Sequence, residues 1–346
     1  MSAGEGTGVS AGNGAGVGAG NGATVQDPPV KPVKGRGPTF VTRFLESRHL
    51  GWAGLALGLL APFIIATPYA MDVMTSAVVF VMLAVGLNIV VGYCGLLDLG
   101  YAAFFAVGAY TSGVLSTELK LPLLATVPAV IVVTVLAGVI IGGPTLRLRS
   151  DYLAIVTLGF GEIIRITANN LSITGGPSGI YGIPGLFGDA TSDPVVFYYA
   201  VLVIVAVAVL LAARLGRSRI GRAWRFVRED EDAAEAMGIN TYKVKLAAYI
   251  AGAVWGGLAG VLFAAQLSAI SPASFTFLQS ALVLMAVVLG GMGSTPGVVL
   301  GAVVISILPE VLRGLADYRF FAFGVLLIIV MIARPQGLWP HRSRER

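Results

Sequence analysis

Long apolar runs separated by short polar stretches repeat along the chain from about residue 50 onward. A helix that crosses a bilayer needs about 20 mostly apolar residues. Ten runs meet or approach that length, which predicts an all-α fold, a polytopic transmembrane helical bundle. The runs are 50–68, 73–92, 96–117, 121–142, 152–168, 195–214, 246–267, 277–291, 297–312 and 320–333.

The glycine-rich stretch at 290–297 leaves the number of crossings open. It reads Gly-Gly-Met-Gly-Ser-Thr-Pro-Gly, and glycine and proline at this density break helices. Residues 277–312 therefore form either two short spans or one long, broken element. We expect about 8–10 spans. The lower number corresponds to eight full crossings plus re-entrant segments.

Positive charge lies mainly in the polar segments between and around the spans. With ten spans and a cytoplasmic amino terminus, 19 of the 23 Lys and Arg residues fall on the cytoplasmic side. Lys and Arg accumulate on that side of membrane proteins, so both termini are expected in the cytoplasm. The predicted organisation is a cytoplasmic tail over 1–48, a transmembrane domain over 49–334 with a cytoplasmic loop at 215–245, and a basic cytoplasmic tail over 335–346.

The amino-terminal tail is rich in glycine before it becomes basic. Nine of its first 24 residues are glycine, and such a segment has too little apolar surface to pack, so it should be disordered. It also lacks the basic start and apolar run of a signal peptide. A solvated extension is the preferred interpretation, and a partner-binding arm is the alternative.

Composition excludes several classes of protein. The chain is 56% hydrophobic and only 12% charged, against about 25% charged in an average soluble domain. Cys94 is the only cysteine, so a disulfide scaffold is excluded, and both histidines lie in polar flanks. Phosphate-binding Gly-Lys loops, His-Glu-x-x-His and paired-cysteine metal ligands are absent from the sequence. We therefore expect neither an enzyme nor a metal centre.

A nucleic-acid partner is not expected either. The net charge of +5 follows from the membrane flanks. Trp224 and Phe226 are the only aromatics interleaved with arginines in the large loop, and aromatics beside a span are more typical of interfacial anchors. A Gly-x-Ser-x-Gly match at residues 8–12 lies in the low-complexity tail, without the strand and helix that a nucleophile elbow needs.

The largest polar loop has a basic half, 214–228, followed by an acidic start at 229–232. Good helix formers with acidic residues in the first turn predict a short helix over 229–237. Gly238 and Asn240 offer a stop, and Ala233, Ala234 and Ala236 would give the helix a slim surface. The loop is either a docking element or an ordinary solvated loop whose arginines fix topology. Spacing alone favours neither interpretation.

Polar residues within the apolar runs each need a reason, because a charge in a bilayer costs about 2.5 kcal/mol or more. Asp98 follows two glycines and is preferred as the cap of a helix over 99–117; holding a loop or lining a cavity is the alternative. Glu162 and Arg165 are three residues apart and can pair on one helix face. A self-satisfied ion pair near the outer surface is preferred for them over a polar element beside a pathway. Asn88 is expected to form a hydrogen bond between helices. The candidate pathway or helix-break positions are Asn88, Gly92, Gly95, Asp98, Glu162, Arg165, Gly290, Gly291 and Gly293.

Several motifs resemble one transporter family. Asp232-Ala233-Ala234, followed after three residues by Gly238, is similar to Glu-Ala-Ala-x-x-x-Gly in the EAA loop of ABC importer permeases. Asp232 stands where Glu is usual, and the family's downstream Ile-x-Leu-Pro element is missing. Four further stretches, 86–110, 146–165, 174–179 and 288–294, resemble the LivM-type permeases of branched-chain amino acid ABC importers. Together the resemblance extends over roughly residues 75–335.

The resemblance implies a membrane-spanning subunit of an ATP-driven importer for leucine, isoleucine and valine, located in the lipid of the bacterial cytoplasmic (inner) membrane. It also implies a second, LivH-type permease, two LivG/LivF-type ATPase subunits and an extracytoplasmic solute-binding protein. ATP would be bound by the ATPases, so this chain would need no cofactor. Asp232, Ala233, Ala234 and Gly238 would couple ATP hydrolysis to alternating access.

Two alternatives remain. Related permeases for urea or short amides share much of the pattern but tend to carry Ser-Leu-Gly-His where this chain has Asp98-Leu-Gly-Tyr101, which favours the amino-acid branch. A secondary transporter working alone would need titratable relays and, in many cases, inverted repeats. The sequence offers only Asp98, Glu162 and Glu310 as charge carriers and no convincing internal repeat.

Overall fold

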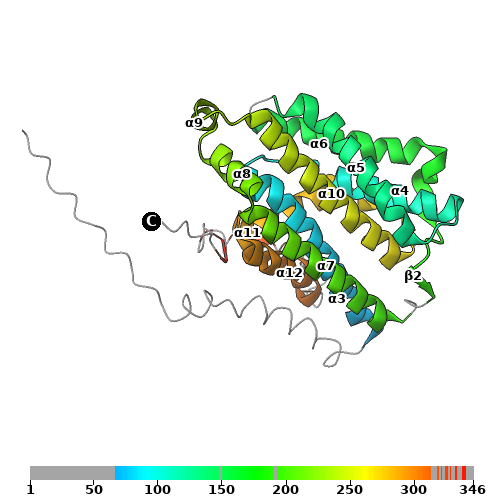
Figure 1. Cartoon of the computed structure of the whole chain (residues 1–346). Coiled ribbons are helices and arrows are strands. Elements are labelled where there is room, and N and C mark those ends of the chain that lie inside the picture. The colour runs from blue at the N-terminus through cyan, green and yellow to red at the C-terminus, as the bar shows by residue number, and fades with distance from the viewer. Residues whose placement is uncertain are drawn as a thin grey trace, which may run out of the picture. The chain divides into compact units, whose positions relative to one another are not determined.

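The structure is a computed structural model that describes residues 67–147, 150–189 and 193–312, with scattered positions between 318 and 339. Over these residues the fold is helical apart from short strands (Figure 1). The longer helices are α3 Pro68–Leu87, α4 Ala102–Glu118, α5 Leu123–Thr145, α6 Ser150–Asn170, α7 Pro194–Arg217, α10 Thr241–Leu267, α11 Phe277–Gly290 and α12 Thr295–Val311.

These eight helices correspond to eight of the ten expected runs. Five segments of the described chain are long and apolar enough to cross a membrane, and α12 is apolar but shorter. The five are Pro68–Tyr93, Leu123–Thr145, Pro194–Arg217, Thr241–Leu267 and Pro272–Gly290. The expected span 50–68 and the two tails, 1–48 and 335–346, lie almost wholly outside the described residues, and the expected span 320–333 is described only at scattered positions.

Two short helices lie between α7 and α10 at one end of the bundle (Figure 1). They are α8, Arg219–Glu229, and α9, Glu231–Ala236. The opposite end carries β1, Ile180–Tyr181, paired antiparallel with β3, Ala269–Ile270. It also carries the single-turn 3₁₀ helices η2 Ser172–Thr174, η3 Gly176–Ser178 and η4 Pro272–Ser274, and the strand β2 Leu186–Asp189. We call the two ends the α8–α9 end and the strand end.

α10 is the central helix of the bundle and packs against α3, α4 and α5. Glycine makes this close packing possible, because a side chain on either surface would separate the helices. A Cβ on Gly108 of α4 would lie 2.1 Å from the carbonyl oxygen of Gly257 on α10. A Cβ on Gly257 would in turn lie 2.3 Å from Cγ2 of Thr134 on α5.

The first irregular segment follows α3, which continues into the π-helix η1, Asn88–Tyr93. The expected span 96–117 begins only at Ala102, since residues 94–101 form no regular helix beyond Cys94. Gly95 has a left-handed φ of 76°. Further along, Leu99 donates its N–H to Thr157 Oγ1 at 3.1 Å, which draws the segment against α6.

A second irregular segment joins α10 to α11. Ser268 has a left-handed φ of 51°, and the β1–β3 pairing and η4 follow. Phe275 then packs its ring against Phe105 and Phe263 at centroid distances of 5.1 and 6.0 Å, inside the bundle. α11 follows this segment and has only 14 residues, a length of about 21 Å.

Candidate functional site

The polar loop expected to carry one short helix carries two. Ser218 caps α8 by accepting the N–H of Gly221 at 3.2 Å, so the basic half of the loop is helical, which the sequence analysis had not predicted. Asp230 caps α9 by accepting the N–H of Ala233 at 2.9 Å. α9 thus begins two residues later than expected, because Asp230 acts as the cap rather than as part of the first turn.

Gly238 ends this segment as the sequence analysis predicted. Its φ is 83°, a left-handed conformation that favours glycine. Its N–H donates to the Glu235 carbonyl at 2.9 Å, and Ile239 donates to the Ala234 carbonyl at 3.0 Å. Asn240 then caps α10 by accepting the N–H of Lys243 at 3.0 Å.

The four candidate coupling residues do not share one surface. Asp232, Ala233 and Gly238 are exposed, whereas Ala234 is fully buried within this chain. Met237, which the sequence analysis did not single out, has 74% of its surface exposed beside them. A surface available to a partner therefore includes Asp232, Ala233 and Met237, while Ala234 anchors α9 to its own subunit.

Side-chain contacts fix the loop to the start of α10. Trp224 is buried and donates its indole N–H to the Val244 carbonyl at 2.9 Å. Lys245 pairs with Glu231 of α9, and Thr241 donates to the Glu235 carboxylate at 2.7 Å. These contacts join α8 and α9 to the first turns of α10.

Arg228 makes a second connection, from the loop to the irregular segments of the bundle. Its guanidinium donates a hydrogen bond to the carbonyl of Gly92, in η1. A Cβ on Gly293 would lie 3.1 Å from Nη1 of the same arginine, and one on Gly95 would lie 2.8 Å from its Cγ. Since all three positions are glycine, the arginine fits between the end of η1 and the turn that joins α11 to α12.

Asn88 links the same two regions directly. Its Oδ1 accepts the N–H of Gly293 at 2.9 Å, so the hydrogen bond expected for Asn88 is present and joins η1 to the α11–α12 turn. In that turn, Gly291 and Gly293 have φ values of 107° and 86°. A Cβ on Gly290 would lie 2.3 Å from the Gly297 carbonyl oxygen. The candidate glycines therefore gather at the α8–α9 end.

Asp98 does not cap α4, so that prediction was wrong. α4 begins at Ala102, and Asp98 is fully buried four residues earlier. Its Oδ1 accepts the N–H of Gly100 at 2.8 Å, while Oδ2 has no hydrogen-bond partner in the part of the chain that the structure describes. Gly100 packs so closely on Thr157 of α6 that a Cβ there would lie 1.9 Å from the Thr157 carbonyl oxygen. This backbone contact displaces the helix start.

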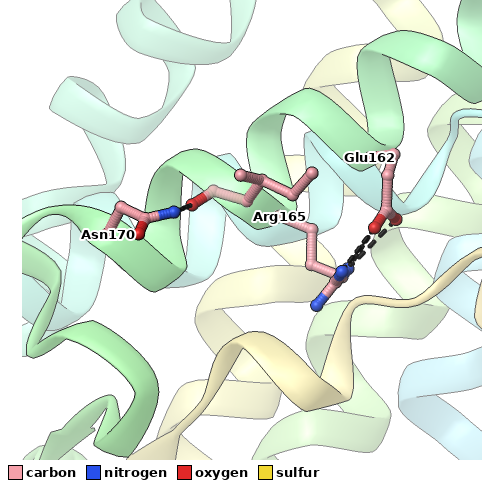
Figure 2. A network of polar contacts seen from close by, with 4 residues as sticks. Glu162, Arg165 and Asn170 are labelled. Carbon is pink, nitrogen blue, oxygen red and sulfur yellow. Dashed lines mark hydrogen bonds and ion pairs between the residues drawn. The ribbon is translucent and has the colours of Figure 1, made fainter.

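Glu162 and Arg165 form the expected ion pair on α6 (Figure 2). Nε of Arg165 lies 3.0 Å from each carboxylate oxygen of Glu162. The side chains remain 29% exposed for Arg165 and 43% exposed for Glu162. Asn170 closes the same helix by donating to the Ile166 carbonyl at 2.7 Å.

The apolar helices of the bundle indicate a multi-pass membrane protein, and a family match places it among the permeases. The family described as "Branched-chain amino acid transport system / permease component" matches residues 69–333, and the chain belongs to this family.

Named relatives agree with that assignment. The chain is 43% identical over 335 residues to the high-affinity branched-chain amino acid transport system permease protein LivM of Salmonella typhimurium, with 88% of this chain and 79% of the relative covered. It is 42% identical over 312 residues to LivM of Escherichia coli, with 83% and 73% covered. LivH of Salmonella typhimurium is 24% identical over 283 residues, with 75% and 90% covered. No solved structure matches the chain significantly.

Proposed function

We propose that this chain is a membrane-spanning subunit of an ATP-driven ABC importer for leucine, isoleucine and valine in the bacterial cytoplasmic membrane. The relatives named for branched-chain amino acid transport support the substrate. The concentration of Lys and Arg in the α7–α10 connection supports a cytoplasmic position for the α8–α9 end and for both termini.

The contact between Arg228 and Gly92 is the observation that carries the coupling mechanism. An ATPase subunit bound to the exposed residues of α9 would move α8 and α9 together. Arg228 would transmit the movement to the end of η1, and the Lys245–Glu231 pair would transmit it to α10. The helices would then reorient by rigid-body shifts, opening the pathway alternately to each side.

Partner proteins supply the remaining functions. ATP would be bound by two LivG/LivF-type ATPases, and a LivH-type permease would complete the membrane part. An extracytoplasmic solute-binding protein would deliver the amino acid to the strand end.

Reconstitution tests the class of transporter. The chain is placed in proteoliposomes with or without its sister permease and ATPases, and uptake of radiolabelled leucine is measured. Uptake should require ATP, the ATPases and the binding protein, and excess urea should not compete. Uphill uptake by this chain alone, driven by a proton or sodium gradient, would establish a secondary transporter instead.

An arginine substitution tests the coupling route. Arg228→Ala should lower ATP-driven leucine uptake at least tenfold while the ATPases still co-purify and hydrolyse ATP, because the loop remains folded but loses its contact with Gly92. Arg219→Ala, in the same helix at an exposed position, is the matched control and should transport normally. Equal uptake by both variants would contradict the route through Arg228.

A further inference from the structure

Helix α6 presents a stripe of exposed residues in which an ion pair lies between aliphatic side chains. Ile155, Leu158 and Ile166 are 69%, 37% and 48% exposed. Steps of three or four residues place them on one side of the helix with Glu162 and Arg165. We call these five residues the α6 stripe. The side of α6 that packs against α4 and α5 is formed by buried residues, namely Leu153, Ala154, Thr157 and Ala168.

The position of the stripe is difficult to explain by lipid contact. α6 has 21 residues, a length of about 31 Å, but it is not among the segments of the described chain that are apolar enough to cross a membrane. Charged side chains within membrane helices face the bundle interior or a water-filled cavity, because lipid cannot solvate them. Glu162 and Arg165 instead lie on the outward side of α6, on which their own chain leaves them partly exposed. That side therefore needs water or another subunit against it.

The chemistry of the stripe matches a zwitterion with an aliphatic side chain. A guanidinium binds a carboxylate through two parallel hydrogen bonds, and a carboxylate accepts hydrogen bonds from an ammonium group. Arg165 and Glu162 already satisfy one another, with Nε donating to Oε2 and Nη2 donating to Oε1. An amino acid would replace that mutual contact with one contact at each of its charges, and no net charge would be added to the site.

We propose that the α6 stripe is a recognition site in the translocation pathway, with Arg165 binding the α-carboxylate and Glu162 the α-ammonium group of the amino acid. The inference rests on the proposed function. Ile166, which directly follows Arg165 in the stripe, contacts the branched side chain. Urea and short amides carry neither charge, so the pair also discriminates against them.

Thiol labelling tests whether the stripe faces water. In the assembled transporter, cysteine is introduced by Ile155→Cys or Ile166→Cys and treated with a membrane-impermeant maleimide. The background is favourable because Cys94, the only native cysteine, is buried, and the wild-type chain serves as the unlabelled control. Thr167→Cys is the matched control on the same helix, since Thr167 is exposed but lies about 140° around the helix from Glu162 and about 100° from Ile166. Stripe positions should be labelled at least tenfold faster than position 167.

Substrate protection tests recognition itself. Millimolar leucine should slow labelling of Ile166→Cys at least threefold, whereas 4-methylpentanoate, without the ammonium group, and isopentylamine, without the carboxylate, should not. Adding Glu162→Gln or Arg165→Gln should abolish the protection. Absence of labelling in the stripe, absence of protection by leucine, or protection that survives in both pair variants would each overturn the proposal.

Uptake measurements separate recognition from a structural ion pair. Glu162→Gln and Arg165→Gln should each lower leucine uptake at least tenfold at saturating binding protein, with ATPase association retained. The double variant E162R/R165E keeps an ion pair but reverses its polarity, and it should remain as defective as the single variants. Restored uptake in the double variant would show that the pair only holds the helix and would overturn the proposal. Absence of ATP-driven leucine uptake in the wild-type complex would instead contradict the proposed function.

Discussion

Replacing Gly108 by alanine should destabilise the bundle at its central helix crossing. The added Cβ would lie 2.1 Å from the Gly257 carbonyl oxygen and 2.4 Å from the Gly257 Cα, whereas close C···O contacts in proteins are about 3.3 Å. α4 and α10 would have to separate by about 1 Å, since neither atom belongs to a side chain that can rotate away. Overpacking of this kind costs about 1–3 kcal/mol.

The assay is thermal unfolding of the purified transporter in lipid nanodiscs. A loss of 1 kcal/mol lowers Tm by about 2–4 °C in proteins of 150–250 residues, so Gly108→Ala should lower Tm by about 2–12 °C. Gly159→Ala is the matched control, because no atom lies within 4 Å of a Cβ at that position of α6. Alanine there also improves helix propensity by about 1 kcal/mol. If both variants unfold at the wild-type temperature, the backbone contact between α4 and α10 is refuted.

Two buried side-chain hydrogen bonds should differ in strength in the same assay. Asn88→Ala leaves the buried N–H of Gly293 without its acceptor, which costs about 1–3 kcal/mol and should lower Tm accordingly. Tyr101→Phe removes a donor to the Gly252 carbonyl, an oxygen that keeps its bond within α10, so the loss should be about 0.6 kcal/mol. A larger fall in Tm for Tyr101→Phe than for Asn88→Ala would contradict this reasoning.

Uninterrupted apolar runs were the most predictable part of the fold. The run at 121–142 corresponds to α5, Leu123–Thr145, and the run at 195–214 corresponds to α7, Pro194–Arg217. Hydropathy determines such helices because every turn is apolar and no competing contact draws the chain away. The prediction from the run at 96–117 was wrong at its start. There Asp98 accepts a hydrogen bond from Gly100, and Gly100 packs on Thr157 of α6. No local sequence pattern specifies these contacts.

The site was predictable where its signal was local. Gly238 as the stop and acidic residues before Ala233 could be recognised from propensity alone. The helix α8 was overlooked because its arginines suggested a solvated loop. Its buried positions, Gly221, Trp224 and Val227, recur at three-residue spacing, and this was the available signal. The hydrogen bond from Arg228 to Gly92 joins residues 136 positions apart, which a single sequence does not reveal.

The two irregular segments are the part of this bundle that counting apolar runs does not describe. Residues 94–101 approach α4 from the α8–α9 end, where Arg228 contacts Gly95. Residues 268–276 approach α11 from the strand end, where β3 pairs with β1. The helices that follow meet inside the protein, because the N–H of Ala102 donates to Oγ of Ser280 at 2.9 Å. A displacement of α8 would therefore act on residues 94–101, which lead directly to the contact between Ala102 and Ser280. Through that contact it would also act on the first turn of α11. Coupling through the proposed route consequently needs no further connecting element, since residues 94–101 run from the α8–α9 end to the middle of the bundle.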